Sequence, residues 1–326
     1  MPILSICIPT FNRLNYLKES LEILLPEAES NGVEVCVSDN NSNDGTKKFL
    51  NEISLKYKCL RYNINSKNEG IDKNMLAVIS MGLGCYIYPL GDDDILPKNS
   101  LRDILYEIES GGDVVILNGW HTNSILVKKR LHLSSSISGR KFTRTNEAFI
   151  ALWDIMPFGS FLASKECFLD SYSHRFIGTS HAYTGVIWDC LANIEKNKGS
   201  CYVKCMEKPS VLLRGGEKSW QQDTALIMLY QIPHWLSLLM ETEAYSKIIP
   251  KIRSEFLMNQ TNISSLIQLR VIGQLDNCEI RKLGRECTRE QVQRMTIISM
   301  IPRDFIISLV KTLDQLKAIA KKVLRK

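Results

Sequence analysis

The first 118 residues alternate between apolar, strand-like runs and amphipathic, helix-like segments. Such alternation is typical of a mainly parallel sheet with helices on both faces. The expected strands are residues 3–9, 33–38, 59–65, 84–90 and 113–118. The expected helices are residues 14–25, 44–57, 70–81 and 98–109, and the first of them should stop at Pro26. The pattern therefore predicts an α/β, Rossmann-like fold.

Polar clusters follow each of the first four expected strands. They are PTFNR (9–13), SDNNSNDGT (38–46), NSKNEG (65–70) and GDDD (91–94). In open α/β sheets, ligands bind beyond the carboxyl ends of the strands. We therefore expect the four clusters to form one binding site at this edge.

The remaining two thirds of the chain are less regular. Residues 119–145 are polar, with a flexible loop expected at 134–141, and from about Gln221 the pattern is helical. Short strands are expected near 159–164, 201–206 and 210–214. We expect three parts, with boundaries at 1–118, 119–220 and 221–326.

Composition narrows the class of protein. The ten cysteines include no Cys-x-x-Cys pair, which argues against a zinc site, and several lie inside apolar strand-like runs. No signal-peptide pattern is present, and no apolar run reaches the roughly 18–20 residues that span a bilayer. These features predict a cytosolic protein with reduced thiols.

Three adjacent aspartates, Asp92, Asp93 and Asp94, follow the fourth strand. Clustered carboxylates at a strand end suit a hard divalent cation, Mg²⁺ or Mn²⁺, which can neutralise the charge on a departing diphosphate. The alternative is a solvated acidic turn in which Asp94 caps the following helix. The position at the expected ligand edge favours the metal site.

The cluster at 38–46 has the alternation of a calcium loop, with Asn40, Ser42 and Asp44 before Gly45. However, Asn51 occupies the twelfth position, where a calcium loop needs a bidentate glutamate. The small polar side chains are better suited to hydrogen-bonding a base or ribose.

In order and spacing, the four clusters resemble the nucleotide-sugar half of a family-2 glycosyltransferase with the GT-A fold. This resemblance covers about residues 1–118 and implies that their strand-end residues bind the nucleotide sugar. The implied contacts are Pro9, Thr10, Arg13, Asp39, Asn41, Asp44, Asn68, Gly70, Asn74 and Asp92. This sequence departs from the family's Asp-x-Asp-Asp motif, because Gly91 replaces the first aspartate of the motif. Asp93 is then the leading metal ligand, with Asp92 and Asp94 beside it.

Inverting members of this family use an acidic base about a hundred residues after the metal motif. Asp189 lies 96 residues after Asp93 and would accept the proton of the acceptor hydroxyl. His181 competes with it as the base, or would serve as an acceptor contact or a metal ligand. The plain alternatives are an aspartate on a helix surface and a structural histidine.

The segment at 212–220, LLRGGEKSW, is predicted to be a glycine-hinged loop. As a lid, it would place Arg214 and Lys218 over the diphosphate and stack Trp220 on a sugar. An ordinary exposed connection is the alternative.

Residues 176–186 together with 214–220 resemble, more loosely, the abequosyltransferase-like branch of the family. This implies a CDP-3,6-dideoxyhexose donor, such as CDP-abequose, and an undecaprenyl-diphosphate-linked oligosaccharide acceptor of O-antigen synthesis. If an α-linked donor gave an α-linked product, configuration would be retained and a simple Asp189 base would be the wrong mechanism.

The tail, residues 303–326, contains seven Lys/Arg and two Asp, and its apolar residues recur at helical spacing. Such a helix suits an anionic membrane surface, which predicts a protein peripheral to the inner face of the cell membrane. The alternative is a helix packed on its own domain or on a second subunit. No nucleic-acid-binding motif is present.

The sequence thus predicts a metal-dependent glycosyltransferase of surface-polysaccharide assembly. A sugar-phosphate nucleotidyltransferase is one rival, but it would ordinarily carry a glycine-rich phosphate loop after the first strand, and PTFNRLNY has none. A nucleotide-sugar-binding protein without turnover is the other rival. Oligomeric state is open.

Overall fold

The computed structural model describes residues 1–169, 174–215 and 219–312. The chain divides into two compact units. The first contains residues 1–217 and 242–245, and the second contains residues 218–241 and 246–326.

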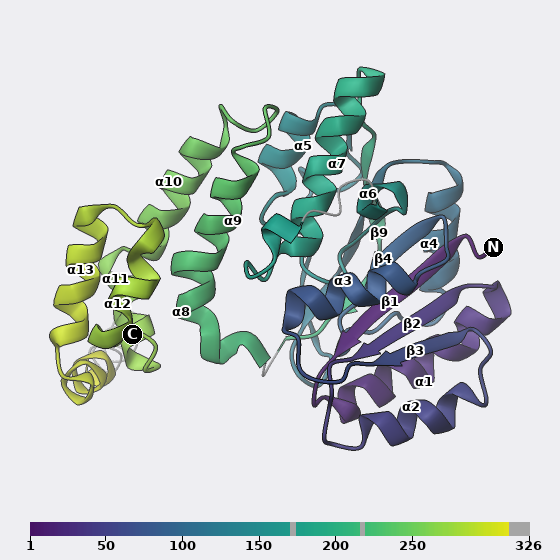
Figure 1. Cartoon of the computed structure of the whole chain (residues 1–326), viewed down its shortest axis with the longest axis horizontal. Helices are drawn as coiled ribbons and strands as arrows, with labels where there is room; N and C mark the ends of the chain where they lie inside the picture. Colours follow the sequence, from purple (N-terminus) through teal and green to yellow (C-terminus); the bar gives the residue numbers. More distant parts are fainter. Residues whose placement is uncertain (170–173, 216–218, 313–326) are drawn as a thin grey trace, which may run out of the picture. The chain divides into compact units, whose positions relative to one another are not determined.

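The first unit is built on a nine-stranded mixed sheet (Figure 1). The strand order is β3-β2-β1-β4-β8-β5-β9-β7, with β6 paired to β5 alone. The strands are β1 (Leu4–Thr10), β2 (Glu34–Asp39), β3 (Leu60–Ile64), β4 (Tyr86–Pro89), β5 (Val114–Thr122), β6 (Lys128–Leu131), β7 (Lys141–Phe142), β8 (Phe161–Ser164) and β9 (Val203–Leu213). The first four are parallel to one another, as the apolar runs predicted.

The register of the parallel strands aligns their polar ends. Thr10 of β1 lies opposite Asp39 of β2, and Asp39 lies opposite Ile64 of β3. Every residue of β1 and β2 is buried, so a one-residue slip would exchange the side chains that face each layer. The buried runs thereby bring the strand-end clusters to one edge.

Helices cover both faces of this sheet (Figure 1). They are α1 (Leu14–Asn31), α2 (Thr46–Ser54), α3 (Ile71–Met81), α4 (Ser100–Glu109), α5 (Thr145–Leu152), α6 (Glu166–Leu169) and α7 (Ala182–Lys198). α3 packs on β1 and β2 and contacts α7, whereas α1 contacts α4. One core cluster joins α1 and α4 to the central strands.

The prediction that the first helix ends at Pro26 is wrong. α1 continues through Pro26 to Asn31 and ends at Gly32, whose φ of +65° is a left-handed cap. Proline removes one helical hydrogen bond, but Leu24, Leu25 and Ala28 are buried around it. Burial of this apolar face keeps the helix intact.

The second half of the sheet departs from the simple parallel pattern. β8 lies antiparallel between β4 and β5, and one strand, β9, replaces the two expected at 201–206 and 210–214. β5 extends through residue 118 to Thr122. Residues 134–140, where a flexible loop was expected, form hydrogen-bonded turns.

The second unit is helical in its described part. It contains α8 (Thr224–Leu226), a π-helical turn (Ile227–Gln231), α9 (Ile232–Leu239), α10 (Ile249–Gln260), α11 (Ile263–Val271), α12 (Ile280–Leu283) and α13 (Arg289–Met300). Short 3₁₀ turns lie at Ser219–Asp223, Asn277–Glu279 and Gly284–Glu286. Leu229, Leu266 and Met295 contribute to a separate core.

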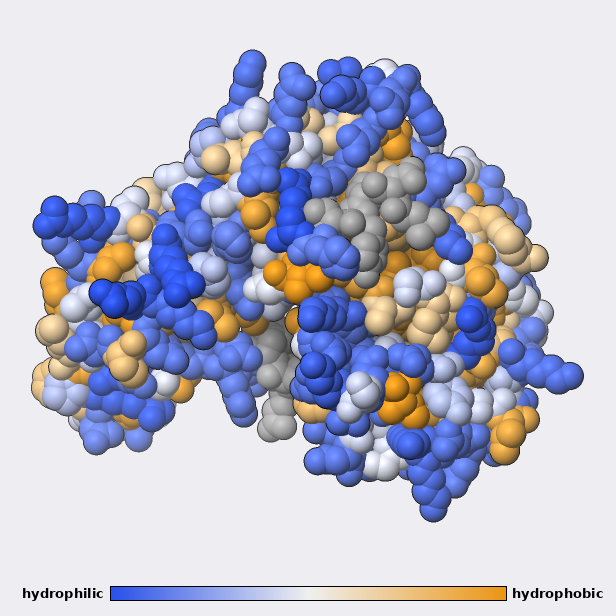
Figure 2. Space-filling model, in the orientation of Figure 1, coloured by the Kyte–Doolittle hydropathy of each residue, from blue (hydrophilic) through white to orange (hydrophobic). Residues whose placement is uncertain are grey.

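The predicted amphipathic tail falls only partly within the described residues. Residues 303–312 are helical, and residues 313–326 lie outside. Ile306, from the apolar stripe, is buried in the core of the second unit. Among the described helices, none has the length and apolar character needed to cross a membrane. Figure 2 shows hydrophilic residues over most of one face of the molecule, with apolar residues scattered among them.

Candidate functional site

The loops after β1 and β2 are bonded to each other at the sheet edge. The backbone N–H of Asn12 donates to Ser42 Oγ at 2.8 Å, and the N–H of Asn43 donates to Asn12 Oδ1 at 2.9 Å. Asn12 and Asn41 both have positive φ, which asparagine tolerates better than most residues. The two predicted clusters therefore form one surface.

Asp44 holds the starts of two helices. Its Oδ2 accepts from the N–H of Leu14, the first residue of α1, and its Oδ1 accepts from the N–H and hydroxyl of Thr46, the first residue of α2. Burial alone would raise the pKa of Asp44, but the hydrogen bonds from Thr46 and Leu14 lower it below its ordinary value. Asp44 is thus a helix cap shared by α1 and α2.

Asp39 ends β2, and one of its carboxylate oxygens lacks a hydrogen-bond partner within the part of the chain that the structure describes. The side chain is fully buried, and Oδ1 accepts from the N–H and hydroxyl of Ser42. Oδ2 is also buried but has no partner among the described residues. A buried, unpaired carboxylate oxygen is costly unless a ligand supplies a donor.

An asparagine network connects the ends of β2 and β3 to the start of α3. Asn40 donates to Asn68 Oδ1 at 2.8 Å and accepts from Asn65 at 3.0 Å, while Asn74 accepts from the Ser38 hydroxyl at 2.7 Å. The N–H of Gly70 also donates to Asn68 Oδ1. Sequence reasoning missed Asn40 and Asn65, although both lie within the quoted clusters.

Gly70 begins the turn into α3 with a φ of +84°, a backbone conformation that favours glycine. This turn brings Asn68 and Asn74 to the same edge. The predicted residues Asn68, Gly70 and Asn74 are therefore linked to the end of β2, beside Asp39.

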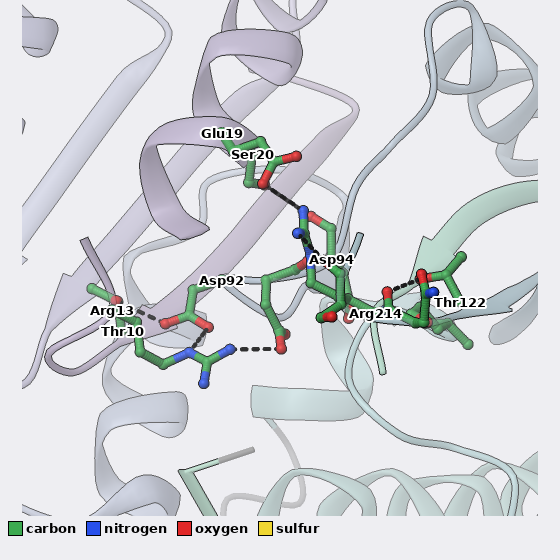
Figure 3. A network of polar contacts seen from close by, with 12 residues as sticks. Thr10, Arg13, Glu19, Ser20, Asp92, Asp94, Thr122 and Arg214 are labelled. Carbon is green, nitrogen blue, oxygen red and sulfur yellow. Dashed lines mark hydrogen bonds and ion pairs between the residues drawn. The ribbon is translucent and has the colours of Figure 1, made fainter. Parts of the chain in front are cut away.

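The acidic triplet lies in the same region, and its first two carboxylates share one guanidinium (Figure 3). Arg13 Nε donates to Asp92 Oδ1 at 2.8 Å, and Arg13 Nη2 donates to Asp93 Oδ2 at 2.6 Å. The Thr10 hydroxyl donates to Asp92 Oδ2 at 2.8 Å. Burial raises the pKa of Asp92 to about 6, although Arg13 acts in the opposite direction.

Asp94 points into a different set of contacts. Its Oδ1 accepts from the backbone N–H of Arg214, and its carbonyl accepts from the Ser20 hydroxyl. Asp94 Oδ2 lies so close to Gly91 and Gly159 that a Cβ on either glycine would approach it to 2.7 or 2.6 Å. The three aspartates therefore do not converge on one point.

Arg214 is a buried bridge, with a side chain 6% exposed. Its guanidinium donates to Glu19, to the Asp93 carbonyl at 2.8 Å and to the Ser124 carbonyl at 2.9 Å (Figure 3). In this position it holds the triplet segment against α1. Lys218 and the side chain of Trp220, the other lid candidates, lie outside the described residues.

The residues at the triplet suit a hard divalent cation by donor type, because carboxylate oxygens are its usual protein ligands. In the described part of the chain, no group of three or more His, Cys, Asp and Glu side chains is placed to hold one ion. The Arg13 guanidinium shows that the space between Asp92 and Asp93 accommodates positive charge. Those two carboxylates are the part of the triplet that fits a cation.

Asp72, which sequence reasoning missed, joins α3 to the loop before α7. Its buried carboxylate accepts backbone N–H groups from Gly178, Ser180 and Ala182, at 2.8, 2.9 and 3.1 Å. A carboxylate at a helix N-terminus also interacts favourably with the helix dipole. Since these contacts span more than a hundred residues, no local sequence signal identified them.

His181 lies at the N-cap of α7, within the loop that Asp72 holds. Its Nδ1 is 3.1 Å from the Thr179 carbonyl oxygen. A carbonyl only accepts, so Nδ1 carries the proton and Nε2 of the neutral ring carries the lone pair. Burial lowers the pKa of His181, against the effects of Thr179 and Asp72.

Asp189, the other base candidate, lies within α7 in an ion pair. Arg175 Nη2 donates to both of its oxygens at 2.7 Å, and the Thr242 hydroxyl donates to Oδ1 at 2.7 Å. Asp189 is therefore not a freely solvated helix-surface aspartate. These bonds engage both carboxylate oxygens.

Comparison with known proteins identifies similar sequences and folds. Residues 5–166 match the sequence model described as Glycosyl transferase family 2. The abequosyltransferase RfbV of Salmonella typhimurium is 28% identical over 240 residues, which cover 68% of this chain and 69% of RfbV. The GalNAc(5)-diNAcBac-PP-undecaprenol beta-1,3-glucosyltransferase of Campylobacter jejuni is 27% identical over 148 residues, covering 45% of this chain and 46% of that protein.

The fold is similar to that of S. aureus TarS residues 1–349, solved in complex with UDP-GlcNAc. The TM-score is 0.62 at 13% identity, and the match covers 96% of this chain and 92% of that one. At this identity, the likeness concerns the fold alone.

Proposed function

We propose that the chain is a member of glycosyltransferase family 2 and that it transfers a sugar from a nucleotide-sugar donor to a lipid-linked glycan acceptor. The likeness to TarS confirms the predicted GT-A fold, and the family match together with the named relatives indicates a glycosyltransferase. The donor, the acceptor and the role of each site residue are our proposals.

The observation that carries the donor site is the unpaired Oδ2 of Asp39. It ends β2 at the ligand edge of the sheet, opposite Thr10. An imide or amino N–H of a base, or a ribose hydroxyl, would satisfy this oxygen. Pro9, Asn41 and the Asn68–Asn74 turn would then line the nucleoside pocket.

We place the diphosphate of the donor beside Arg13, Asp92 and Asp93. Asp93, with Asp92, would hold Mg²⁺ or Mn²⁺, and a bound ion would neutralise charge on the departing nucleoside diphosphate. Arg13 orients both carboxylates and keeps positive charge at the same place. The bonds of Asp94 to the Arg214 segment assign it a positioning role in this scheme.

For the proton of the acceptor hydroxyl, we favour His181 over Asp189. The Thr179 carbonyl fixes a neutral tautomer with its lone pair on Nε2, as a general base requires. Asp189 instead neutralises Arg175. An inverting reaction would use His181 in this way, and a retaining one would leave it as an acceptor contact.

The relatives support a donor and an acceptor class. One is named an abequosyltransferase, which favours CDP-abequose or a related CDP-3,6-dideoxyhexose as donor. The name of the other contains an undecaprenol diphosphate, which favours an undecaprenyl-diphosphate-linked oligosaccharide as acceptor. We propose a role in O-antigen or other surface-polysaccharide synthesis, peripheral to the cytoplasmic face of the membrane, with the tail from residue 303 as one membrane contact.

Calorimetric titration of the full chain with UDP, CDP, GDP and dTDP, each with and without Mn²⁺, tests the donor site. We expect one nucleotide, CDP, to bind best and Mn²⁺ to strengthen its binding. Asp39→Asn should weaken that binding, whereas Glu52→Gln, on the exposed face of α2, should leave it unchanged. Failure of every nucleotide to bind the folded protein would contradict the proposed site. Binding without sugar transfer to any lipid-linked acceptor would support the rival binding protein.

A further inference from the structure

A hairpin formed by residues 119–133 extends from the sheet, and we call it the basic hairpin. It consists of the end of β5, a turn, and β6, with Trp120 opposite Leu131 and Thr122 opposite Lys128. Among the described strands, β6 pairs with β5 alone. The hairpin therefore forms an open edge of the first unit.

Its turn and outer strand expose apolar side chains. Ile125 is 76% exposed, Val127 is 55% exposed and Leu131 is 41% exposed. Exposed apolar residues are common singly, but here three lie within seven positions of one hairpin. Such a concentration of exposed apolar side chains is typical of a contact surface.

The same segment is positively charged. Lys128, Lys129 and Arg130 are exposed, and residues 119–133 contain no Asp or Glu. Within the part of the chain that the structure describes, none of these three side chains forms an ion pair, and Lys128 lies over the Trp120 ring. Burial lowers the pKa of His132 to about 4, so its ring adds no charge near neutral pH.

The basic hairpin begins at the sheet edge that carries the candidate site. The N–H of Gly215 donates to the Thr122 carbonyl at 2.9 Å. Arg214 joins the Ser124 carbonyl in the turn to the Asp93 carbonyl, and Figure 3 shows Thr122, Arg214 and Asp94 together. A partner bound to the hairpin would therefore lie beside the acidic triplet.

We propose that the basic hairpin docks on an anionic lipid surface. Lys128, Lys129 and Arg130 meet the headgroups, and Ile125 and Val127 enter the interfacial layer. Charge complementarity favours this partner. The hairpin has basic residues and no acidic ones, which suits anionic headgroups, and its exposed aliphatic side chains suit the hydrocarbon beneath them. This contact is distinct from the tail and requires no particular donor or acceptor.

Co-sedimentation of the full chain with phosphatidylcholine vesicles, with and without phosphatidylglycerol, tests the proposal. We expect binding to the anionic vesicles that weakens at high salt. K128S/K129S/R130S should weaken it on the order of a hundredfold, since each basic residue at the surface contributes about fivefold. I125S/V127S should weaken both the binding to anionic vesicles and any residual binding to neutral vesicles.

Two matched controls use exposed residues of the same unit. K47S/K48S removes basic residues from α2, and Leu55→Ser removes a side chain that is 88% exposed. Both should bind vesicles like the unaltered chain. Circular dichroism and urea unfolding verify that each variant is folded.

Three outcomes would overturn the proposal. They are no binding of the unaltered chain to anionic vesicles, equal loss in the α2 controls, and unchanged binding of the hairpin variants. Self-association of the chain that the hairpin variants abolish, without vesicle binding, would assign the surface to a second copy instead. Because no nucleotide is present in this assay, its failure is separate from failure of the donor site.

Discussion

Asp72, in the first turn of α3, accepts a 3.1 Å hydrogen bond from the backbone N–H of Ala182, the first residue of α7. The same carboxylate accepts two more backbone bonds from the loop that carries His181. One buried side chain therefore connects the helix after the Asn68–Gly70 turn to a candidate base more than a hundred residues later.

Asp72→Asn should destabilise the first unit. An amide offers one acceptor oxygen and turns its NH₂ group toward backbone donors, so buried N–H groups lose their partners, at a cost of about 3 kcal/mol. Urea unfolding measures the change in the free energy of unfolding. The exposed control Glu52→Gln should change it by about 0–1 kcal/mol. Equal stability of the two variants would show that the loop does not depend on Asp72.

Arg13→Ala should increase the extent to which a divalent cation stabilises the folded protein. Two adjacent buried carboxylates lose their shared counter-charge, which costs about 3 kcal/mol. A cation that binds between them would replace part of that stabilisation. Thermal unfolding should therefore show a larger rise in Tm with Mn²⁺ for the variant than for the unaltered chain. The double variant R13A/D92N should lose this extra rise, and a rise equal in all three would contradict a cation at this position.

The raised pKa of Asp92 predicts a pH dependence of stability. Between the unfolded pKa of about 3.9 and the folded value of about 6, the folded chain binds more protons than the unfolded chain. The stability contributed by this proton is fully present below the unfolded pKa and is lost as the pH rises through 6, by about 3 kcal/mol over the two pKa units. Urea unfolding at several pH values should show this fall in the unaltered chain and a flatter profile in Asp92→Asn. Parallel profiles for the unaltered chain and Asp92→Asn would mean that a group other than Asp92 causes the pH dependence.

His181 and Asp189 can be separated by kinetics once the nucleotide screen has identified the donor. His181→Gln should lower kcat about 10²- to 10⁴-fold while leaving nucleotide affinity unchanged, as expected for loss of a general base. It should also remove the acid limb of the pH–rate profile, which burial places below the ordinary pKa of histidine. Asp189→Asn should mainly lower stability, because it removes the part-buried ion pair with Arg175. A larger kcat loss in Asp189→Asn, at full folding, would reverse the assignment.

Sequence patterns predicted the parallel half of the sheet because β1, β2 and most of β4 are buried on both faces and read as apolar runs, whereas the edge strand β3 alternates between buried and exposed residues. The same logic placed Thr10, Arg13, Asp39 and the acidic triplet at one edge, where the structure brings them together. Alternation of strand and helix is a local property, and adjacency of strand ends follows from parallel topology.

What sequence reasoning missed depends on contacts between distant segments. The insertion of β8 between β4 and β5 requires an antiparallel return that no local pattern specifies. The bonds of Asp72 to the α7 loop, and of Arg214 to Glu19 and the triplet, span about a hundred residues or more. Pro26 misled the prediction of α1 because tertiary burial of Leu24 and Leu25 outweighs the hydrogen bond that proline removes.

The close packing of Gly91 and Gly159 against Asp94 Oδ2 restricts which residues can occupy positions 91 and 159. Any side chain at residue 91, including the aspartate that the family motif has there, would collide with Asp94 as it now lies. Asp94 in turn is held by the backbone of Arg214. A side chain at residue 91 or 159 therefore requires the Asp94 carboxylate to turn aside, which would disturb the hydrogen bond that it accepts from the Arg214 N–H. The two glycines thus act as spacers that let the third aspartate of the triplet keep its present position.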